Sequence, residues 1–403
     1  MAALNEEQTI LRDVAKSWVD ERSPVSAFRK VRNAELESGF DPGTWKEMAE
    51  MGWSAVIVPE DFGGAGLDYL TMGLIFEQLG RTLNASPLLM TGVGAVSAIL
   101  QGGSPSQQNK WLPRISEGSC VAALAFEEGA RHDLGNVSAT AVKSGTGFVL
   151  NGQKTFVVDG MAANLLLVSA KVDDKIEVFL VPSDLPGIQR EKLNLADGRG
   201  AALVSFKDVA LDEDSTLSGG IELLEHIADR VRAVLSAEML GSSIQAFETT
   251  VEYLKTRVQF GHVIGSFQAL QHRAAAMLGK IELSRSVVEA ALTAIDQGRE
   301  NVPMLVVGQL ERNHHAAAGL GLRKRDFYAL ELRQLSFRCG SSTALQDEQT
   351  FPVDAAGPEE VPRMFPVDTF RIDDFGRCGR FEAGPGIVSD HRRLPFPPPR
   401  GPR

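Results

Sequence analysis

The residues best suited to chemistry gather in one short stretch, residues 253–268. Arg257 ends a long amphipathic segment, Phe260-Gly261 makes a corner, and Gln268 stands at the start of a second helical segment. Because a guanidinium is planar and always charged, Arg257 could bond two oxygens of a phosphate group at once. An ordinary helix hairpin with a glycine corner is the alternative interpretation.

Asp229 and Arg232 form a second candidate pair, in the segment that leads to this stretch. Residues three apart on a helix share a face, so the carboxylate and the guanidinium could point into one groove. The alternative is a solvated ion pair within the helix, which is common and weak.

A third group of candidates lies in residues 122–133, which include Phe126, Glu127, Gly129 and His132. Histidine can exchange a proton near neutral pH, so His132 is a candidate base. A polar contact to a substrate and a bystander role are the other interpretations. A plain loop without chemistry is the alternative for the whole group.

These stretches together resemble the acyl-CoA dehydrogenase family of flavoproteins, over roughly residues 5–305. Residues 257–268 are similar to the family pattern R-x-x-F-G-x-x-I-G-x-F-Q. The resemblance implies FAD as cofactor, with Arg257 on its pyrophosphate, Phe260 in the same turn and Gln268 on its adenosine half. It also implies that FAD lies between subunits, so that at least a dimer is required.

The flavin ring would meet two more elements of the family pattern. Residues 122–133 resemble A-x-x-x-T-E-P-G-A-G-S-D, which implies that the backbone N–H groups of Ala125 and Phe126 serve the ring. Residues 152–160 resemble G-x-K-x-W-I-T-N-G, in which the Trp covers the ring and the Thr bonds the flavin N5. Phe156 keeps an aromatic face, but Val158 cannot donate a hydrogen bond. One tuning contact is therefore lost, while hydride acceptance stays with the flavin itself.

The reaction that the resemblance implies is α,β-desaturation of an acyl-CoA thioester, with an electron-transfer flavoprotein as acceptor. Asp229 and Arg232 would meet the pantetheine and phosphate parts of CoA, and His132 lies in the loop that contacts acyl-CoA. The family takes its base from a late C-terminal loop or from the helix position that is Val231 here. Valine cannot accept a proton and no late acid matches, so we name no catalytic base.

The missing base leaves two interpretations of the function. The first is an acyl-CoA dehydrogenase, and the second is a catalytically incomplete partner subunit of a hetero-oligomeric one. The departures from the family pattern resemble pimeloyl-CoA dehydrogenase small subunits and actinobacterial sterol-degrading dehydrogenases. Oxidase or monooxygenase chemistry is a weaker third option. Fatty, dicarboxylic, aromatic and sterol side-chain thioesters all stay open as substrates.

Three blocks of the chain must position these residues. Residues 1–117 and 216–305 show the spacing of amphipathic helices, whereas residues 118–215 alternate with a period of two. Blocks in this order argue against a Rossmann sheet, in which strands and helices alternate. The sequence predicts a mainly α protein with a central β domain. The resemblance implies an N-terminal helical domain, a middle β-barrel and a C-terminal helical bundle, here incomplete.

Two hairpins are predicted in the β block. Asn151-Gly152 lies between alternating apolar runs, which is the strongest short hairpin signal. Asp173-Asp174 lies between the apolar runs 164–170 and 176–181.

The last block, residues 306–403, departs from this pattern. Residues 351–403 hold ten of the 19 prolines and eight arginines but no lysine. Such a composition opposes a packed bundle, because proline removes helix hydrogen bonds. A low-complexity, disordered tail is one interpretation, and a translated reading-frame shift in a GC-rich gene is the favoured one.

Composition limits the partners and the setting. The chain has 403 residues, a hydrophobic content of 43% and a net charge of -11, which argues against nucleic acid and anionic membrane as partners. Cys120, Cys339 and Cys378 lack metal spacing, which predicts no metal site and a reduced, cytoplasmic setting. No apolar run reaches the length of a membrane span.

Overall fold

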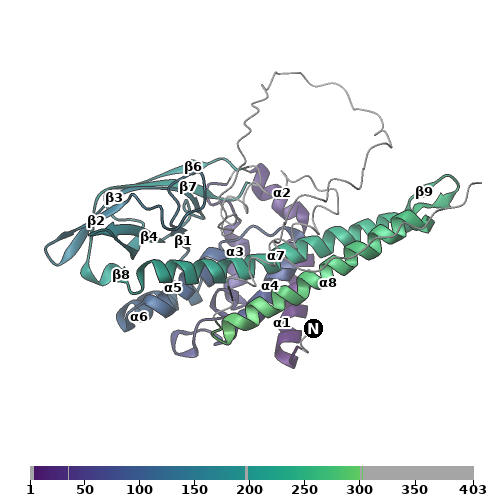
Figure 1. The fold of residues 1–403 in the computed structure, drawn as a ribbon, viewed down its shortest axis with the longest axis horizontal. Helices are drawn as coiled ribbons and strands as arrows, with labels where there is room; N and C mark the ends of the chain where they lie inside the picture. Colours follow the sequence, from purple (N-terminus) through teal and green to yellow (C-terminus); the bar gives the residue numbers. More distant parts are fainter. Residues whose placement is uncertain (1–3, 35, 196–197, 300–301, 303–403) are drawn as a thin grey trace, which may run out of the picture. The chain divides into compact units, whose positions relative to one another are not determined.

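The computed structural model describes residues 4–34, 36–195, 198–299 and 302, all within the unit Met1–Ser341 (Figure 1). Helices, then a sheet, then two long helices follow one another along the chain, which confirms the predicted fold class. The atypical block 306–403, with Cys339 and Cys378, lies outside the described residues. Within the described part, no helix combines the length and the apolarity that crossing a bilayer requires.

Polar caps set the starts of the N-terminal helices. Asn5, Asp41, Asp68 and Ser104 each accept a hydrogen bond from the backbone N–H three residues later, which satisfies a donor that the helix leaves free. The helical elements of this region are α1 (Glu6–Arg22), α2 (Val25–Asn33), α3 (Pro42–Glu50), η1 (Trp53–Ala55), η2 (Glu60–Phe62), α4 (Tyr69–Thr82), the π-helical η3 (Leu89–Ala95), α5 (Val96–Gly102) and α6 (Pro105–Ser116).

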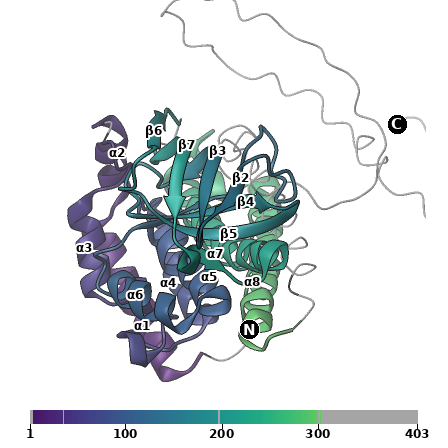
Figure 2. The same cartoon turned by 90° about the vertical axis from the view of Figure 1, so that its left-hand side faces the viewer.

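The central strands form one mixed sheet, in the order β6-β7-β3-β2-β4-β5-β8, with β1 parallel to β4. The strands are β1 (Ala122–Ala125), β2 (Thr140–Ser144), β3 (Gly147–Val158), β4 (Leu165–Val172), β5 (Lys175–Pro182), β6 (Ile188–Leu193), β7 (Ala201–Leu211) and β8 (Thr216–Leu217), with the one-turn helix η4 (Glu213–Ser215) before β8. Figure 2 shows the sheet stacked on the helical layer.

Alternate residues of the strands serve two different cores. Leu165 and Leu167 of β4 belong to the core that the sheet shares with the helices, whereas Leu166 and Val168 belong to a second core within the sheet domain. This alternation follows from the period of two along a strand. The long runs of apolar residues in β4 and β5 are therefore buried on both faces.

The hairpin predicted at Asn151-Gly152 is wrong. β3 continues through both residues, and its register with β7 shifts between Leu150 and Gly152. Gly152 has a φ of 143°, and a Cβ there would lie 2.7 Å from the Cα of Ala139. Glycine is needed for a bulge and a close approach, so the same residue type carries a different meaning here.

The hairpin predicted at Asp173-Asp174 is confirmed. It joins β4 to β5, and both residues have positive φ values, 46° for Asp173 and 68° for Asp174. Two left-handed residues in a two-residue loop match the twist of the flanking strands.

Two long helices complete the described fold: α7 (Gly220–Thr256) and α8 (Gln268–Asp296). The short antiparallel strands β9 (Val258–Gln259) and β10 (His262–Val263), with η5 (Ile264–Ser266), connect them. Buried residues end at Ile244 in α7 and begin only at Ile281 in α8. The part of the pair nearest the β9–β10 hairpin therefore has no core of its own.

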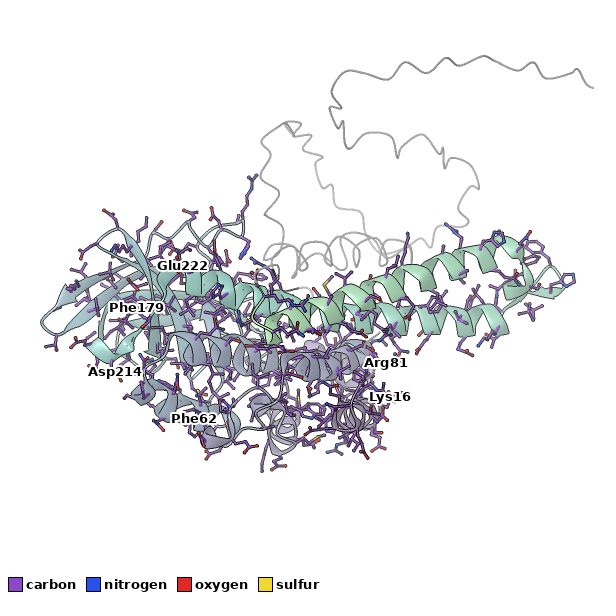
Figure 3. The ribbon with its side chains drawn as sticks, turned by 60° about the horizontal axis from the view of Figure 1, so that its bottom comes forward. Lys16, Phe62, Arg81, Phe179, Asp214 and Glu222 are labelled. Atoms are coloured by element: carbon purple, nitrogen blue, oxygen red, sulfur yellow. The ribbon has the colours of Figure 1, made fainter. Side chains whose placement is uncertain are left out.

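Close packing and two ion pairs hold this helical pair on α4. A Cβ on Gly80 would lie 1.9 Å from the carbonyl oxygen of Glu238, so α4 and α7 cross at backbone contact. The Arg285 guanidinium of α8 lies 2.8 Å from the Glu77 carboxylate of α4. Arg81 of α4, labelled in Figure 3, pairs with Glu248 of α7.

Candidate active site

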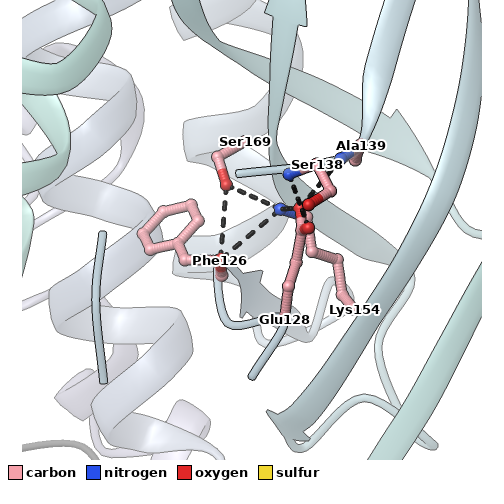
Figure 4. Close-up of polar contacts among 6 residues, drawn as sticks. All are labelled: Phe126, Glu128, Ser138, Ala139, Lys154 and Ser169. Atoms are coloured by element: carbon pink, nitrogen blue, oxygen red, sulfur yellow. Dashed lines mark hydrogen bonds and ion pairs between the residues drawn. The ribbon is translucent and has the colours of Figure 1, made fainter. Parts of the chain in front are cut away.

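A buried lysine organises the loop that follows β1 (Figure 4). Lys154 of β3 is fully buried, and its Nζ donates to Glu128 Oε1 at 2.6 Å, Ser169 Oγ at 2.9 Å and the Phe126 carbonyl at 3.4 Å. These three bonds use the three donors of an ammonium group. The carbonyl of Phe126 and the side chain of Glu128 are thereby fixed at the edge of the sheet.

The partner of this lysine, Glu128, is held in its ionised form. Burial opposes its charge, but hydrogen bonds from Lys154 and from the backbone N–H groups of Ala139 and Ser138 outweigh that effect, so the pKa of Glu128 lies below its usual value. Burial lowers the pKa of Lys154, and the bond to Glu128 opposes this. The pair makes the loop a rigid support.

Four charged or polar side chains form a chain across the site. His132 Nδ1 lies 2.5 Å from Glu127 Oε1, and His132 Nε2 lies 2.6 Å from Arg232 Nη2. Arg232 Nη1 in turn donates to Asp229 Oδ1 at 3.0 Å. The structure thus brings together His132, Asp229 and Arg232, the three predicted substrate-binding residues.

The contacts of His132 favour one tautomer of its ring. A guanidinium has only donors, so Nε2 must accept from Arg232 and carry no proton. The proton then sits on Nδ1, which donates to Glu127. The side chains of His132 and Glu127 are only 9% and 13% exposed, which keeps water from competing for this bond.

A cavity of about 60 Å³ lies beside these four linked side chains, between the loop after β1 and α7. Val158 of β3 and Val231 of α7 both line it, as do Phe126, Glu127 and His132. Val231 thus lies in the cavity wall, at the helix position from which the family resemblance implies a base. A valine side chain there cannot accept a proton. The other lining residues are Met90, Leu124, Leu134, Ala228, Arg232 and Leu235.

A second hollow, of about 360 Å³, lies on the other side of Glu127. Phe156 lines it and has a φ of 54°, which a non-glycine residue adopts only when its surroundings enforce it. The register of β3 with β7 shifts between Lys154 and Val157, and such a bulge re-aims side chains. The other lining residues are Glu128, Gly129, Ala130, Arg131, Gln153, Thr155 and Leu203.

Ala125 and Phe126, predicted to serve the flavin ring with their N–H groups, are buried at the end of β1. Phe126 and Val158 line the cavity together with His132 and Arg232, whereas Phe156 lines the second hollow and Ala125 directly precedes Phe126. The structure therefore places these four predicted cofactor residues near the predicted substrate residues.

Arg257, Phe260 and Gln268 lie elsewhere, at the hairpin between α7 and α8. Figure 1 shows this hairpin, labelled β9, at the far end of α7 from the sheet. Arg232 and Arg257 are 25 positions apart along one helix, which corresponds to about 37 Å. One dinucleotide cannot contact both regions of the same chain. Phe260 is 91% exposed, so the turn is open to another molecule.

Sequence reasoning named Glu127 within the loop motif but gave it no role of its own, and it missed the buried Lys154 and Asp159. Asp159, next to Val158, is buried with a φ of 61°, and burial raises the pKa of its carboxyl to about 7 while Arg199 opposes the shift. A lysine inside an otherwise apolar strand was the available signal for Lys154. For Asp159 the sequence held no signal of its burial, because Arg199 and the other residues around it come from distant segments.

Comparison with known proteins matches all three blocks. Sequence models of the acyl-CoA dehydrogenase N-terminal, middle and C-terminal domains match residues 5–119, 122–209 and 218–308. The mitochondrial isovaleryl-CoA dehydrogenase of Pongo abelii is 29% identical over 73% of this chain and 73% of its own length. The isovaleryl-CoA dehydrogenase of Arabidopsis thaliana is 30% identical over 64% of this chain and 67% of its own.

Solved structures agree on the fold. A chain of the ChsE4-ChsE5 complex from Mycobacterium tuberculosis superposes with a TM-score of 0.71 and 25% identity, over 79% of this chain and 86% of that one. A chain of the structure described as the electron transferring flavoprotein of Acidaminococcus fermentans gives 0.73 and 27%, over 79% and 87%.

Proposed function

Because the chain belongs to the acyl-CoA dehydrogenase family, FAD-dependent oxidoreductases that act on the CH–CH group of acyl-CoA, we propose that it desaturates a short acyl-CoA thioester between the α- and β-carbons. The observation that carries the proposal is the apolar cavity between Val158 and Val231, whose wall also holds the polar side chains of Glu127, His132 and Arg232. Its volume of about 60 Å³ leaves room for about four water-sized groups, which favours a short acyl chain over a sterol side chain. Two relatives named for isovaleryl-CoA support the same size class.

The residues around the second hollow fit FAD. Phe156 offers an aromatic face at the wall of a hollow of about 360 Å³, and the backbone N–H groups of Ala125 and Phe126 come just before Glu127, which lines the same hollow. When bound, FAD accepts the hydride that leaves the β-carbon. The buried side chain of Val158 would exclude water from the cavity, but it cannot donate a hydrogen bond to the flavin.

The linked side chains of His132, Arg232 and Asp229 would hold the CoA part of the substrate. Arg232 is 19% exposed and Asp229 13% exposed, so both reach the surface at the edge of the cavity. Asp229 fixes one nitrogen of the guanidinium and His132 another, and a held arginine loses little side-chain entropy when a phosphate or amide oxygen arrives.

The flavin site would need a second subunit. Arg257, Phe260 and Gln268 lie too far along α7 to serve the hollow of their own chain, so we assign them to the FAD of a neighbouring subunit. The outer ends of α7 and α8 and the connection between them expose apolar side chains that such a neighbour would cover. These residues are Tyr253, Val258, Phe260, Val263, Phe267 and Leu278.

A second candidate function is that of a partner subunit without its own base, which Val231 in the cavity favours. The similar chain from the ChsE4-ChsE5 complex belongs to an assembly of two different proteins. In such an assembly this chain would supply half of a flavin site. Co-expression with an acyl-CoA dehydrogenase that carries a glutamate at the position of Val231 would separate the two functions: a stable mixed oligomer, active where the lone chain is not, supports the partner role.

The test of the first function is reduction of bound FAD. The purified chain is loaded with FAD, freed of excess cofactor, and mixed without oxygen with isovaleryl-CoA, butyryl-CoA or palmitoyl-CoA. The flavin absorbance should fall with the two short thioesters and change little with the long one. A colourless protein that stays colourless after loading would contradict the proposal, and equal bleaching by palmitoyl-CoA would contradict the short-chain assignment.

The acceptor can be tested with the same preparation. We propose that an electron-transfer flavoprotein takes the electrons, as the family membership suggests. Turnover should then depend on added electron-transfer flavoprotein and consume little oxygen. Rapid oxygen consumption with substrate alone would indicate an oxidase instead.

A further inference from the structure

One carboxylate lies where the substrate and the flavin would meet. Of the described residues, Glu127 alone lines both the cavity beside Val231 and the hollow beside Phe156. It is also the one carboxylate among the described residues of the cavity wall. A proton acceptor in this reaction must stand beside the α-carbon, next to the carbon that faces the flavin. We infer that Glu127 is the catalytic base of this chain and that His132 positions it, an inference that rests on the proposed desaturation.

The geometry around Glu127 leaves it able to accept a proton. Its Oε1 takes the Nδ1–H of His132, which orients the carboxylate as a second group orients a catalytic base. The positively charged Arg232 guanidinium contacts the other nitrogen of the same imidazole, so the ring is held from both sides.

Among the described residues, charged groups near Glu127 come from three elements. His132 follows in the same loop, as do Glu128 and Arg131, which line the same hollow. Arg232 and its partner Asp229 stand on α7, and the Lys154 ammonium on β3 interacts with Glu127 through space. Lys154 is already bonded to Glu128, Ser169 and Phe126, so it stabilises the Glu127 carboxylate without taking its lone pairs.

The step balances within the proposed reaction. The bond between the α-carbon and its hydrogen breaks, and the proton passes to the carboxylate of Glu127. The electron pair left behind forms the carbon–carbon double bond as the β-hydrogen leaves as hydride. The oxidant that the family reaction uses is FAD, which would accept this hydride when bound.

The experiment separates proton removal from flavin chemistry. FAD-loaded wild type and the variants Glu127→Gln, His132→Leu and His132→Gln are incubated with isovaleryl-CoA in D₂O, and deuterium at the α-carbon is measured by mass spectrometry. Flavin reduction by the same thioester is followed in parallel. Glu222→Gln, an exposed site on α7, serves as the matched control, and flavin content together with circular dichroism checks folding.

Glu127→Gln should keep its flavin but slow both α-hydrogen exchange and flavin reduction by about 100-fold or more. An effect of this size is expected when a general base is lost. His132→Leu should also slow both rates while its flavin content stays unchanged, because the Glu127 carboxylate loses the donor that orients it. His132→Gln, which keeps a donor, should restore much of the rate.

A rescue variant keeps the inference testable if Glu127→Gln loses activity for another reason. Val231→Glu puts a carboxylate in the wall of the same cavity, so the double variant Glu127→Gln/Val231→Glu should regain exchange. Wild-type rates in Glu127→Gln, or a double variant that stays as slow as Glu127→Gln, would overturn the role of Glu127. A wild type that neither exchanges the α-hydrogen nor reduces flavin with any acyl-CoA would instead overturn the proposed function.

Discussion

Removal of the buried lysine should destabilise the protein far more than removal of an exposed one with the same contact distance. Lys154 and Glu128 are 2.6 Å apart with side chains 0% and 10% exposed, whereas Lys255 and Glu252 are 2.6 Å apart with side chains 63% and 66% exposed. Lys154→Met leaves the Glu128 carboxylate buried with only two backbone donors, at 2.6 Å and 3.1 Å. Loss of one partner of a buried pair costs about 3–5 kcal/mol, and the two remaining donors place this case near about 3 kcal/mol.

The assay is equilibrium urea unfolding, followed by far-ultraviolet circular dichroism. Lys255→Met should change the free energy of unfolding by about 0.5 kcal/mol or less, because exposed pairs contribute little. The double variant Lys154→Met/Glu128→Gln should recover part of the loss, since no buried charge is left without a partner. Equal losses in Lys154→Met and Lys255→Met would refute the argument from burial.

Three further predictions concern the flavin turn, a buried acid and a buried thiol. Arg257→Ala should lower FAD affinity by roughly tenfold to a hundredfold with unchanged helicity, and Arg257→Lys should recover part of the affinity. The exposed control Arg29→Ala should leave FAD affinity unchanged. Equal flavin content in Arg257→Ala and wild type would contradict the assignment. The folded protein favours protonated Asp159, whose pKa is about 7, so its stabilising contribution is present below pH 4 and lost as pH rises through 7. Asp159→Asn should therefore gain up to about 4 kcal/mol relative to wild type between pH 4 and pH 8 in urea unfolding, and parallel pH curves would refute this. Burial raises the pKa of the Cys120 thiol to about 11, so iodoacetamide should label it only after unfolding, and rapid labelling of the folded protein would count against its burial.

Much of the fold was predictable because its signals are local. The period of the apolar residues changes from helical to alternating and back, and Asp173-Asp174 can take two positive φ values in a short turn. Asn151-Gly152 carries an equally strong local signal but sits inside β3. Its meaning depends on the backbone of Ala139, which approaches Gly152 too closely for a side chain. That approach is a tertiary fact that no local pattern contains.

The site was predictable only where one segment holds the whole motif. Asp229 and Arg232 are three residues apart on α7, and the structure shows the pair that the spacing predicts. His132 meets Arg232 from 100 positions away, and this contact depends on how the sheet packs on α7. The double role of Glu127 at the cavity and the hollow has the same origin, since those walls come from β1, β3 and α7.

The central claim, acyl-CoA desaturation, is tested most directly by the product. FAD-loaded protein is mixed anaerobically with one equivalent of isovaleryl-CoA, and the thioester is then analysed by mass spectrometry. The account predicts a thioester that has lost two hydrogen atoms, with the double bond between the α- and β-carbons, in an amount equal to the flavin reduced. Unchanged isovaleryl-CoA beside oxidised flavin, with butyryl-CoA equally unreactive, would contradict it.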